Sequence, residues 1–173
     1  MEIRRATIDD AGAIATVHVR SWQSAYAGVL PQSYLDGLDP RHSGRQWAAV
    51  LEATAWPGTG TLVLTGESGT VIGFAHLSPT RDDDDDSTTV GELQTLYLDP
   101  LVWRGGGGSV LLRAVTTQMA EAGFQAGIAW TLDNNERARS FYEHHGWAPD
   151  GATKLHDWGA FLATDVRYRV ALL

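Results

Sequence analysis

A run of four glycines at residues 105–108 is the part of the sequence best suited to bind an anion. It follows a strand-like alternation over residues 90–98 and precedes apolar residues at helical spacing over 112–122. The first amides of that helix, near Gly107, have no partner within the helix and carry the positive end of its dipole. Because glycine places no side chain before them, the segment predicts a cradle for a phosphate or pyrophosphate.

Two common phosphate-binding motifs fit this cradle poorly. A P-loop requires a lysine after the glycines, and none follows them. A dinucleotide-binding fingerprint requires an acidic residue about 20 positions on, after a second strand. Glu121 lies near that distance but inside the same predicted helix. A flexible glycine-rich linker is disfavoured by the strand and helix patterns on either side.

Residues 92–112 resemble motif A of the GNAT N-acetyltransferase superfamily. In that motif a strand leads through proline and an Arg/Gln-x-x-Gly-x-Gly/Ala turn to a helix that binds the pyrophosphate of acetyl-CoA. Two registers are open. The first takes Arg104 as the basic residue, with Gly107 and Ser109 at the two small positions. The second, which we prefer because both glycine positions are filled, takes Gly106 and Gly108 and puts Trp103 at the basic position.

Residues 135–147 read Asn-Glu-Arg-Ala-Arg-Ser-Phe-Tyr-Glu-His-His-Gly-Trp. They resemble a second motif of this superfamily, Asn-x-x-Ala-x-x-Phe-Tyr-x-x-x-Gly-Phe, with Trp147 at the last position. Residues 3–10 and 150–169 also resemble parts of the family. The resemblance therefore covers most of the chain and implies one GNAT acetyltransferase domain over residues 1–173.

The resemblance implies an acetyl-CoA-dependent N-acetyltransferase that acylates a primary amine by direct attack. Strand backbone would bind the pantetheine arm, the glycine turn would hold the pyrophosphate, and Asn135 would hydrogen-bond the arm. The implied cofactor-binding residues are Leu96, Tyr97, Leu98, Arg104, Gly105, Gly106, Gly107, Gly108, Ser109, Asn135 and Tyr142.

Amide formation requires a neutral amine, a donor for the oxyanion and a proton for the leaving thiolate. The resemblance assigns Tyr142 as general acid, although a core aromatic residue would show the same helical spacing. Glu92 is the candidate base, acting through water, and a surface carboxylate on a strand is an equal alternative; Gln94 or His76 could share the task. The N–H of Leu96 is the expected oxyanion donor.

The amine site in this family is lined by the first two helices and their loop, which makes Trp22, Gln23 and Tyr26 the substrate-binding candidates. Core packing would explain Trp22 equally well. Aminoglycosides, polyamines, amino acids and peptides all offer the same reacting group. We therefore expect a small-molecule or peptide amine without choosing among these classes.

Composition limits the other functions. The chain has 173 residues, no cysteine and a formal net charge of -8 with pI near 5.1. Thiolate zinc sites and a cysteine nucleophile are excluded, and the negative charge argues against nucleic acid as the main partner. We see no signal peptide or membrane span, so we expect a cytoplasmic protein.

The expected fold class is α/β, a single-domain GNAT-like fold with a mixed, mostly antiparallel central sheet flanked by helices. The predicted order of elements is βααα-ββ-β-α-β-α-ββ. Residues 90–132 should form its parallel unit, with a right-handed crossover. Glycine 123 should end the helix that follows the glycine turn.

Five consecutive aspartates, residues 82–86, interrupt this pattern between two predicted strands. We interpret them as a solvated, self-repelling loop. The alternative is a lip that attracts a polycation or a metal ion. Because a contiguous run rarely places several carboxylates around one ion, we assign no metal site.

Two other function classes stay open. A noncatalytic acyl-CoA-binding or sensor domain would keep the fold without the chemistry, and Trp103 at the basic position would suit it. A nucleotide-binding regulatory domain is disfavoured by the missing P-loop lysine. Dimerisation is common in the family, but no apolar stripe in the sequence decides for or against a homodimer.

Overall fold

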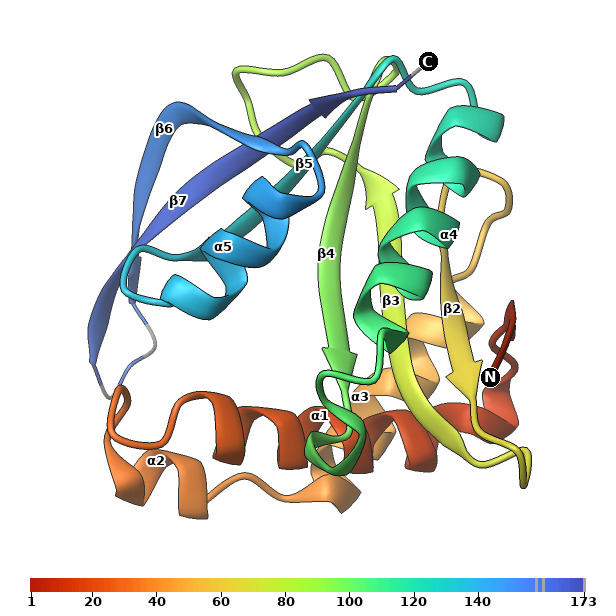
Figure 1. Ribbon diagram of the computed structural model, residues 1–173, viewed down its shortest axis with the longest axis vertical. Coiled ribbons are helices and arrows are strands. Elements are labelled where there is room, and N and C mark those ends of the chain that lie inside the picture. Colours follow the sequence, from red (N-terminus) through yellow and green to blue (C-terminus); the bar gives the residue numbers. More distant parts are fainter. Residues whose placement is uncertain (158, 160, 173) are drawn as a thin grey trace.

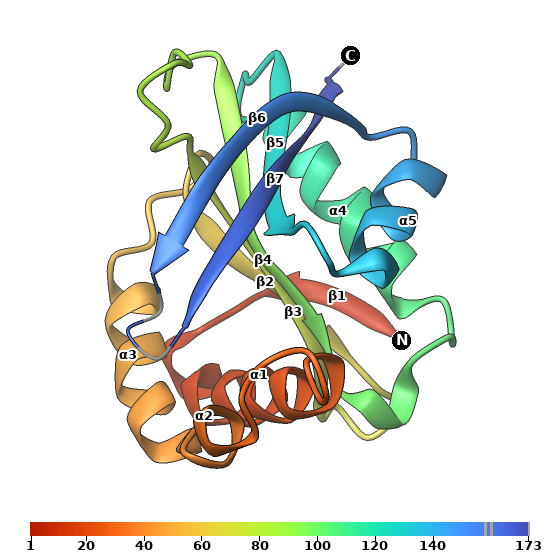
Figure 2. The same cartoon turned by 90° about the vertical axis from the view of Figure 1, so that its left-hand side faces the viewer.

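The computed structural model describes residues 1–157, 159 and 161–172, which form a layer of strands with helices on both faces (Figures 1 and 2). The sheet has seven strands in the order β1-β2-β3-β4-β5-β7-β6. Their bounds are β1 Glu2–Arg5, β2 Gly60–Thr65, β3 Val71–Pro79, β4 Val90–Leu98, β5 Ala126–Leu132, β6 Ala148–Asp157 and β7 Leu162–Ala171. Strands β4 and β5 pair in parallel and the other neighbours are antiparallel. The predicted fold class and parallel unit are confirmed.

The helices divide between the two faces of the sheet. Their bounds are α1 Ala11–Ala25, α2 Gln32–Asp36, α3 Pro40–Glu52, α4 Gly107–Glu121 and α5 Glu136–His144, with short 3-10 turns η1 at Ile8–Asp10 and η2 at Pro100–Val102. One core cluster joins β2, β3 and β4 to α4 and α5, and a second joins the other face to α1 and α3. None of the helices described has the length and apolar character to cross a membrane.

Local sequence signals place most helix ends. The Asn135 side chain accepts from the Ala138 N–H at 3.1 Å and caps α5, and Asp39 caps α3 in the same way. Gly123 has φ of +92° just after α4, as its expected role as a stop requires. The Asp10 carboxylate accepts from Thr7 N–H and pairs with Arg4, both at 2.8 Å, and so ties the start of α1 to β1.

The alternation that predicts β4 fails at its middle. Leu77 of β3 faces Leu93 while His76 faces Thr95, so Gln94 is the extra residue of a β-bulge. A strict period of two puts Leu93 and Leu96 on opposite faces. In the structure both pack in the cluster under α4, because the bulge shifts the pattern by one residue.

Strands β4 and β5 separate just beyond the first half of their length. Their parallel pairing runs from Val90 opposite Ala126 to Leu93 opposite Ala129 and then stops. Strand β5 continues beside β7 through Leu132, while β4 stays with β3 (Figure 1). The second half of β4 therefore has an edge that β5 does not cover. The end of this half, at Leu98, packs against the start of α4.

Two histidines belong to the core rather than to a site that exchanges protons. His18 Nδ1 accepts from Trp47 Nε1 at 3.2 Å, and its ring stacks on Tyr97. His76 is 6% exposed and bonds the Thr61 hydroxyl at 2.8 Å. Burial lowers the pKa of both rings to about 4, so both are neutral at pH 7.

We expect acid to destabilise the fold through these rings. Histidine in the unfolded chain has a pKa of 6.5. Between pH 6.5 and about 4, His18 and His76 are therefore protonated in the unfolded chain and neutral in the folded one. Each ring then lowers the free energy of unfolding by at most about 3 kcal/mol as the pH falls through this window. Urea denaturation and the imidazole proton resonances measure this. Titration of either ring near pH 6.5 would contradict the assignment.

Candidate active site

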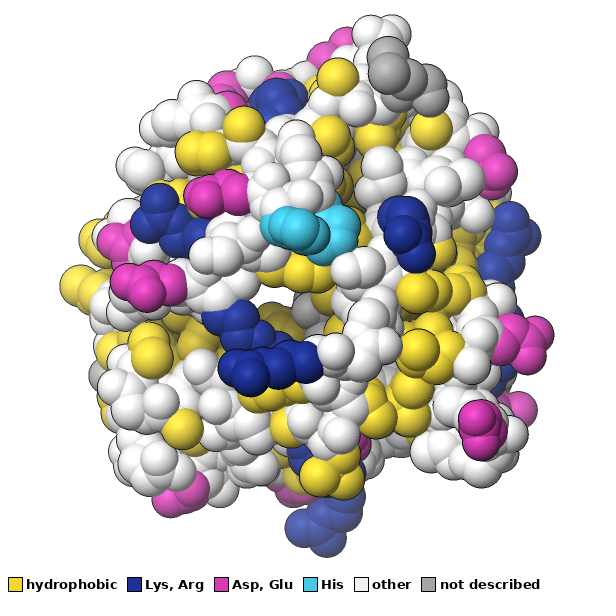
Figure 3. Space-filling view, in the orientation of Figure 1, with side chains coloured by type: hydrophobic (Ala, Val, Ile, Leu, Met, Phe, Trp, Pro, Cys, Tyr) yellow, Lys and Arg dark blue, Asp and Glu magenta, His cyan; other side chains and the backbone are white. Residues whose placement is uncertain are grey.

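A cavity of about 710 Å³ opens where β4 and β5 separate. Its lining comes from β4 from Glu92 onward, the end of β5, the C-terminal half of α1, the N-terminal end of α4, one face of α5 and residues of β6 and β7. Figure 3 shows this face hollowed near its centre, with basic side chains gathered beside the opening. The cavity brings together segments that lie far apart in the sequence.

The glycine turn forms one end of the cavity, and its glycines have different roles. Gly106 is the N-cap residue of α4 at φ of +84°, and a Cβ there would meet nothing within 4 Å. A Cβ on Gly107 would lie 2.6 Å from the Leu98 side chain, so this glycine lets α4 approach β4 closely. Gly108 also lines the cavity, whereas Gly105 does not. The first amides of α4 have no partner within the helix, so the predicted cradle stays a prediction for this end of the cavity.

Trp103 does not fill the cradle. Its indole N–H donates to the Leu98 carbonyl at 3.0 Å, and the Arg137 guanidinium lies 3.5 Å from the centre of its ring. Arg104, at φ of +66°, lies near Arg137 on the same wall. Burial, together with repulsion from Arg104, lowers the pKa of Arg137. Two like charges are thus held beside the free amides.

The remaining cofactor candidates are arranged around this end. The Ser109 hydroxyl bonds His145 Nε2 at 2.9 Å, while His145 Nδ1 donates to the Phe141 carbonyl at 2.8 Å. The hydroxyl of Ser109 is therefore engaged by α5. Asn135 caps α5 and also donates to the Tyr26 hydroxyl at 3.4 Å. Among the described residues, Leu96, Tyr97 and Leu98 line the wall on β4.

The carbonyl of Leu98 is already occupied. Besides Trp103, the Ser21 hydroxyl donates to it. The Tyr97 ring turns to the other face of the sheet, where it stacks on His18 and where burial raises its pKa well above the usual value. The Tyr97 side chain is thus engaged by His18, and Leu96 lines the cavity on the same strand.

Tyr142 lies deep in the same cavity. It is 8% exposed and packs between Trp147 and Tyr168, with ring centres 5.6 and 5.5 Å away. Burial raises its pKa above that of free tyrosine. The hydroxyl thus keeps its proton at neutral pH, as a general acid requires.

Glu92 also lines the cavity, and Arg81 binds its carboxylate. Its side chain is 5% exposed and accepts from the Arg81 guanidinium and the Arg81 N–H, both at 3.2 Å. Gln94 lines the cavity and donates to Ser78. His76 does not reach the main cavity; it borders a shallower hollow of about 220 Å³ on the other face of β4. Glu92 is therefore better placed than His76 to meet a substrate.

Known proteins share both this sequence pattern and this arrangement. The profile of the acetyltransferase (GNAT) family matches residues 19–147. The chain belongs to that family. It is thus an N-acetyltransferase by family, and the predicted family membership is confirmed.

Two relatives from Bacillus subtilis, both described as uncharacterized N-acetyltransferases, resemble this acetyltransferase along most of its length. YuaI is 30% identical over 133 residues, which cover 77% of this chain and 72% of YuaI. YhfO is 28% identical over 150 residues, which cover 87% of this chain and 91% of YhfO.

Solved structures share the fold at lower identity. The PaiA N-acetyltransferase of Thermoplasma acidophilum, crystallised with coenzyme A, has a TM-score of 0.79 at 22% identity and covers 98% of each chain. YncA of Salmonella typhimurium, crystallised with acetyl-CoA, has a TM-score of 0.72 at 18% identity and covers 100% of this chain and 94% of its own.

The other end of the cavity, which we call the acceptor end, differs in part from the sequence-based prediction. Of the three residues predicted to bind the substrate, Trp22 and Tyr26 line the cavity and Gln23 does not. The Gln23 amide instead donates to the Leu35 carbonyl at 3.2 Å and ties α1 to α2. Sequence reasoning missed several lining residues, among them Arg81, Trp130, Lys154, His156 and Asp165.

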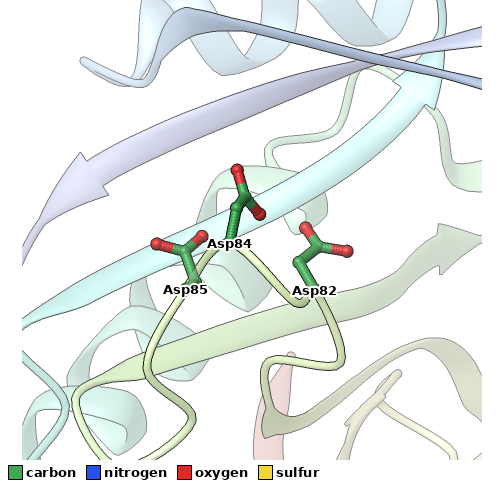
Figure 4. Close-up of side chains that lie close together, drawn as sticks. All are labelled: Asp82, Asp84 and Asp85. Carbon is green, nitrogen blue, oxygen red and sulfur yellow. The ribbon is translucent and has the colours of Figure 1, made fainter.

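The aspartate run is not the free solvated loop that the sequence suggests. Asp82, Asp84 and Asp85 project toward one another (Figure 4), with carboxylate oxygens within 4.8 Å. Arg167 of β7, whose side chain is 7% exposed, bonds all three at 2.8–3.2 Å. The expectation that a contiguous run would not place several carboxylates around one charge was wrong. The three carboxylates surround the Arg167 guanidinium.

This ion-pair network supports the acceptor end. Asp150 also binds Arg167, at 2.7 Å, from the start of β6. Asp82 accepts from the indole N–H of Trp130 at 2.8 Å. Arg81, which holds Glu92, is the residue just before Asp82. The network therefore fixes both the loop that carries Arg81 and the ring of Trp130.

Replacing Arg167 with methionine should destabilise the enzyme by about 3 kcal/mol, because it leaves clustered carboxylates without their cation. The Arg167 hydrogen bond lowers the pKa of Asp84 below the ordinary 3.8. The stabilisation is therefore present above pH 3.8 and lost as the pH falls below it. Urea denaturation at pH 7 and pH 2 should show a large difference from wild type and then a smaller one.

The control for this experiment is Arg41→Met, because Arg41 is 88% exposed and pairs with one exposed aspartate. It should leave stability close to wild type at both pH values. An Arg167→Met effect that is equally large at pH 2 would show that packing, rather than charge, dominates.

Proposed function

We propose that this enzyme transfers the acetyl group of acetyl-CoA to a primary amine by direct attack. One observation supports this most strongly. A single cavity is lined by the start of α4, by Arg104 and Arg137 beside it, and by Tyr142 and Glu92. The anion-binding end suits the pyrophosphate of the acyl donor. The other end offers a proton donor and a proton acceptor for the reaction.

The donor end fits a pyrophosphate in charge as well as shape. The amides of Gly107 and Gly108 lie in the first turn of α4 and have no partner within the helix, and the N-cap Gly106 puts no side chain before them. No carboxylate partner of Arg104 or Arg137 occurs among the residues that the structure describes, although the chain carries a net charge of -8. A bound anion would relieve the repulsion between these two guanidinium groups.

In the proposed reaction the amine nitrogen bonds the acetyl carbon and the carbon–sulfur bond breaks. Glu92 accepts the ammonium proton through water, which frees the nitrogen to attack. The N–H of Leu96, on the stretch of β4 that β5 leaves uncovered, stabilises the oxyanion. Tyr142 protonates the departing sulfur and recovers a proton from the new amide nitrogen.

Binding of acetyl-CoA is the first measurement. Calorimetric titration should show binding to wild type, and the double variant Arg104→Gln, Arg137→Gln should bind about 10–100-fold more weakly, because charged hydrogen bonds to phosphate are lost. Arg113→Gln on the exposed face of α4 is the matched control and should bind as wild type does. Unchanged affinity in the double variant would place the pyrophosphate elsewhere.

Removal of the Tyr142 hydroxyl tests the acid. Tyr142→Phe keeps the ring stack, so we expect kcat to fall about 100-fold or more while acetyl-CoA affinity changes little. Thiol release measures kcat, and calorimetry measures affinity. Tyr168→Phe is the control, because it removes a hydroxyl from the neighbouring ring that bonds Glu143 instead of lining the cavity. Equal rates in Tyr142→Phe and wild type would remove Tyr142 from this role.

The same assay separates catalysis from mere binding. Thiol release that depends on an added amine supports the transferase reaction. Acetyl-CoA binding without release on a broad amine panel would favour the acyl-CoA-binding or sensor function.

A further inference from the structure

The acceptor end of the cavity carries charges of both signs, and they are sorted by depth. The carboxylates are deep: the side chains of Glu92 and Asp165 are 5% and 9% exposed. The cations are at the rim: the Arg81 side chain is 69% exposed, and Lys154 is also exposed. A ligand that fits this gradient has a positive group that enters first and a negative group that stays near solvent.

Lys154 is the only lysine in the chain; the other 12 of its 13 basic residues are arginines. Its nitrogen lies 4.0 Å from the centre of the Trp130 ring, and both residues line the cavity. No ion pair joins Lys154 to a carboxylate within the described part of the chain. Its charge is therefore available to a ligand in the cavity.

Arg81 adds a second donor on the same side. Its Nη2 and Nε bond Glu92, at 3.2 and 3.5 Å, while Nη1 has no hydrogen bond among the described residues. The Trp130 ring contacts Lys154, and its N–H bonds Asp82, the residue after Arg81. Arg81 and Lys154 line the same cavity, so both charges are available to an anionic group bound there.

The walls between the two charge layers are apolar. Trp22, Tyr26 and Leu132 line the cavity together with Trp130 and pack in one cluster beneath α1. A short carbon chain or ring would be buried there, between an amine at Glu92 and an anion at the rim. A diamine or polyamine fits less well, because its second ammonium would lie against Lys154 and Arg81.

We propose that the acceptor is an amino-acid-type molecule, a primary amine that also carries a carboxylate, and that Lys154 binds this carboxylate. The proposal rests on the acetyl transfer proposed above. Lys154 then determines specificity: it contacts the substrate away from the nitrogen that reacts.

The test compares matched acceptors that differ only in the carboxylate. Suitable pairs are phenylalanine with 2-phenylethylamine, lysine with cadaverine, and 4-aminobutyrate with propylamine, assayed by thiol release from acetyl-CoA. Wild type should show kcat/KM at least 10-fold higher for the carboxylate-bearing member of the best pair. A monoamine or diamine without the carboxylate that reacts as well as its matched amino acid would overturn the proposal.

Variants of Lys154 make the test specific. Lys154→Met keeps the side-chain stem over Trp130 and removes the charge, so it should lower kcat/KM about 10-fold for the amino acid and leave the decarboxylated amine unchanged. Lys154→Arg keeps the charge and should retain the preference. Equal losses on both members of the pair would overturn the carboxylate-binding role.

A chemical experiment gives a second readout. Because the chain has one lysine, an amine-acetylating reagent should modify Lys154 and the N-terminus only. The modified enzyme should lose its preference for the amino acid, and Lys154→Met treated in the same way should not change further. If acetyl-CoA binds but no amine of any pair is acetylated, the transfer reaction itself is refuted, a result distinct from acylation without carboxylate preference.

Discussion

The structure depends on the separation of β4 from β5 after Leu93. Parallel strands that kept pairing would hydrogen-bond each other along their whole length and leave no space between them. The bulge at Gln94 lies where the pairing ends, and it also moves Leu96 and Leu98 onto the face that packs against α4. One extra residue therefore accompanies both an open strand edge and the packing that holds the start of α4 beside it.

The cavity is lined by several basic side chains, although the chain as a whole is acidic. A protein with a net charge of -8 lines its cavity with Arg81, Arg104, Arg137 and Lys154. Its aspartates are not spread evenly either, because Asp82, Asp84 and Asp85 gather on Arg167, close to the acceptor end. The net charge of the sequence thus says little about the ligand, whereas the local charge at each end of the cavity is informative.

What could be predicted from the sequence was what is encoded locally. The glycine turn, the Asn135 cap and the stop at Gly123 each depend on a few neighbouring residues, and the structure has all three. The acceptor end could not be predicted, because Arg81, Trp130 and Asp165 meet only through the order of strands in the sheet. The aspartate run was misread for the same reason, since Arg167 lies 83 residues from Asp84. One signal was available and unused: the single lysine of the chain.

Burial places a constraint on how Tyr142 can act. A phenol whose pKa is raised above 10 is a weaker acid than a thiol, whose ordinary pKa is about 8.5, so simple donation to a thiolate is uphill. The nitrogen of a newly formed, still protonated amide is a far stronger acid than either. If the phenol passes its proton to sulfur as it receives the proton from nitrogen, no tyrosinate accumulates and the high pKa costs little. The same burial that makes Tyr142 a poor net donor thus suits a relay between two atoms of the reacting group, with Glu92 left to remove the first proton of the ammonium.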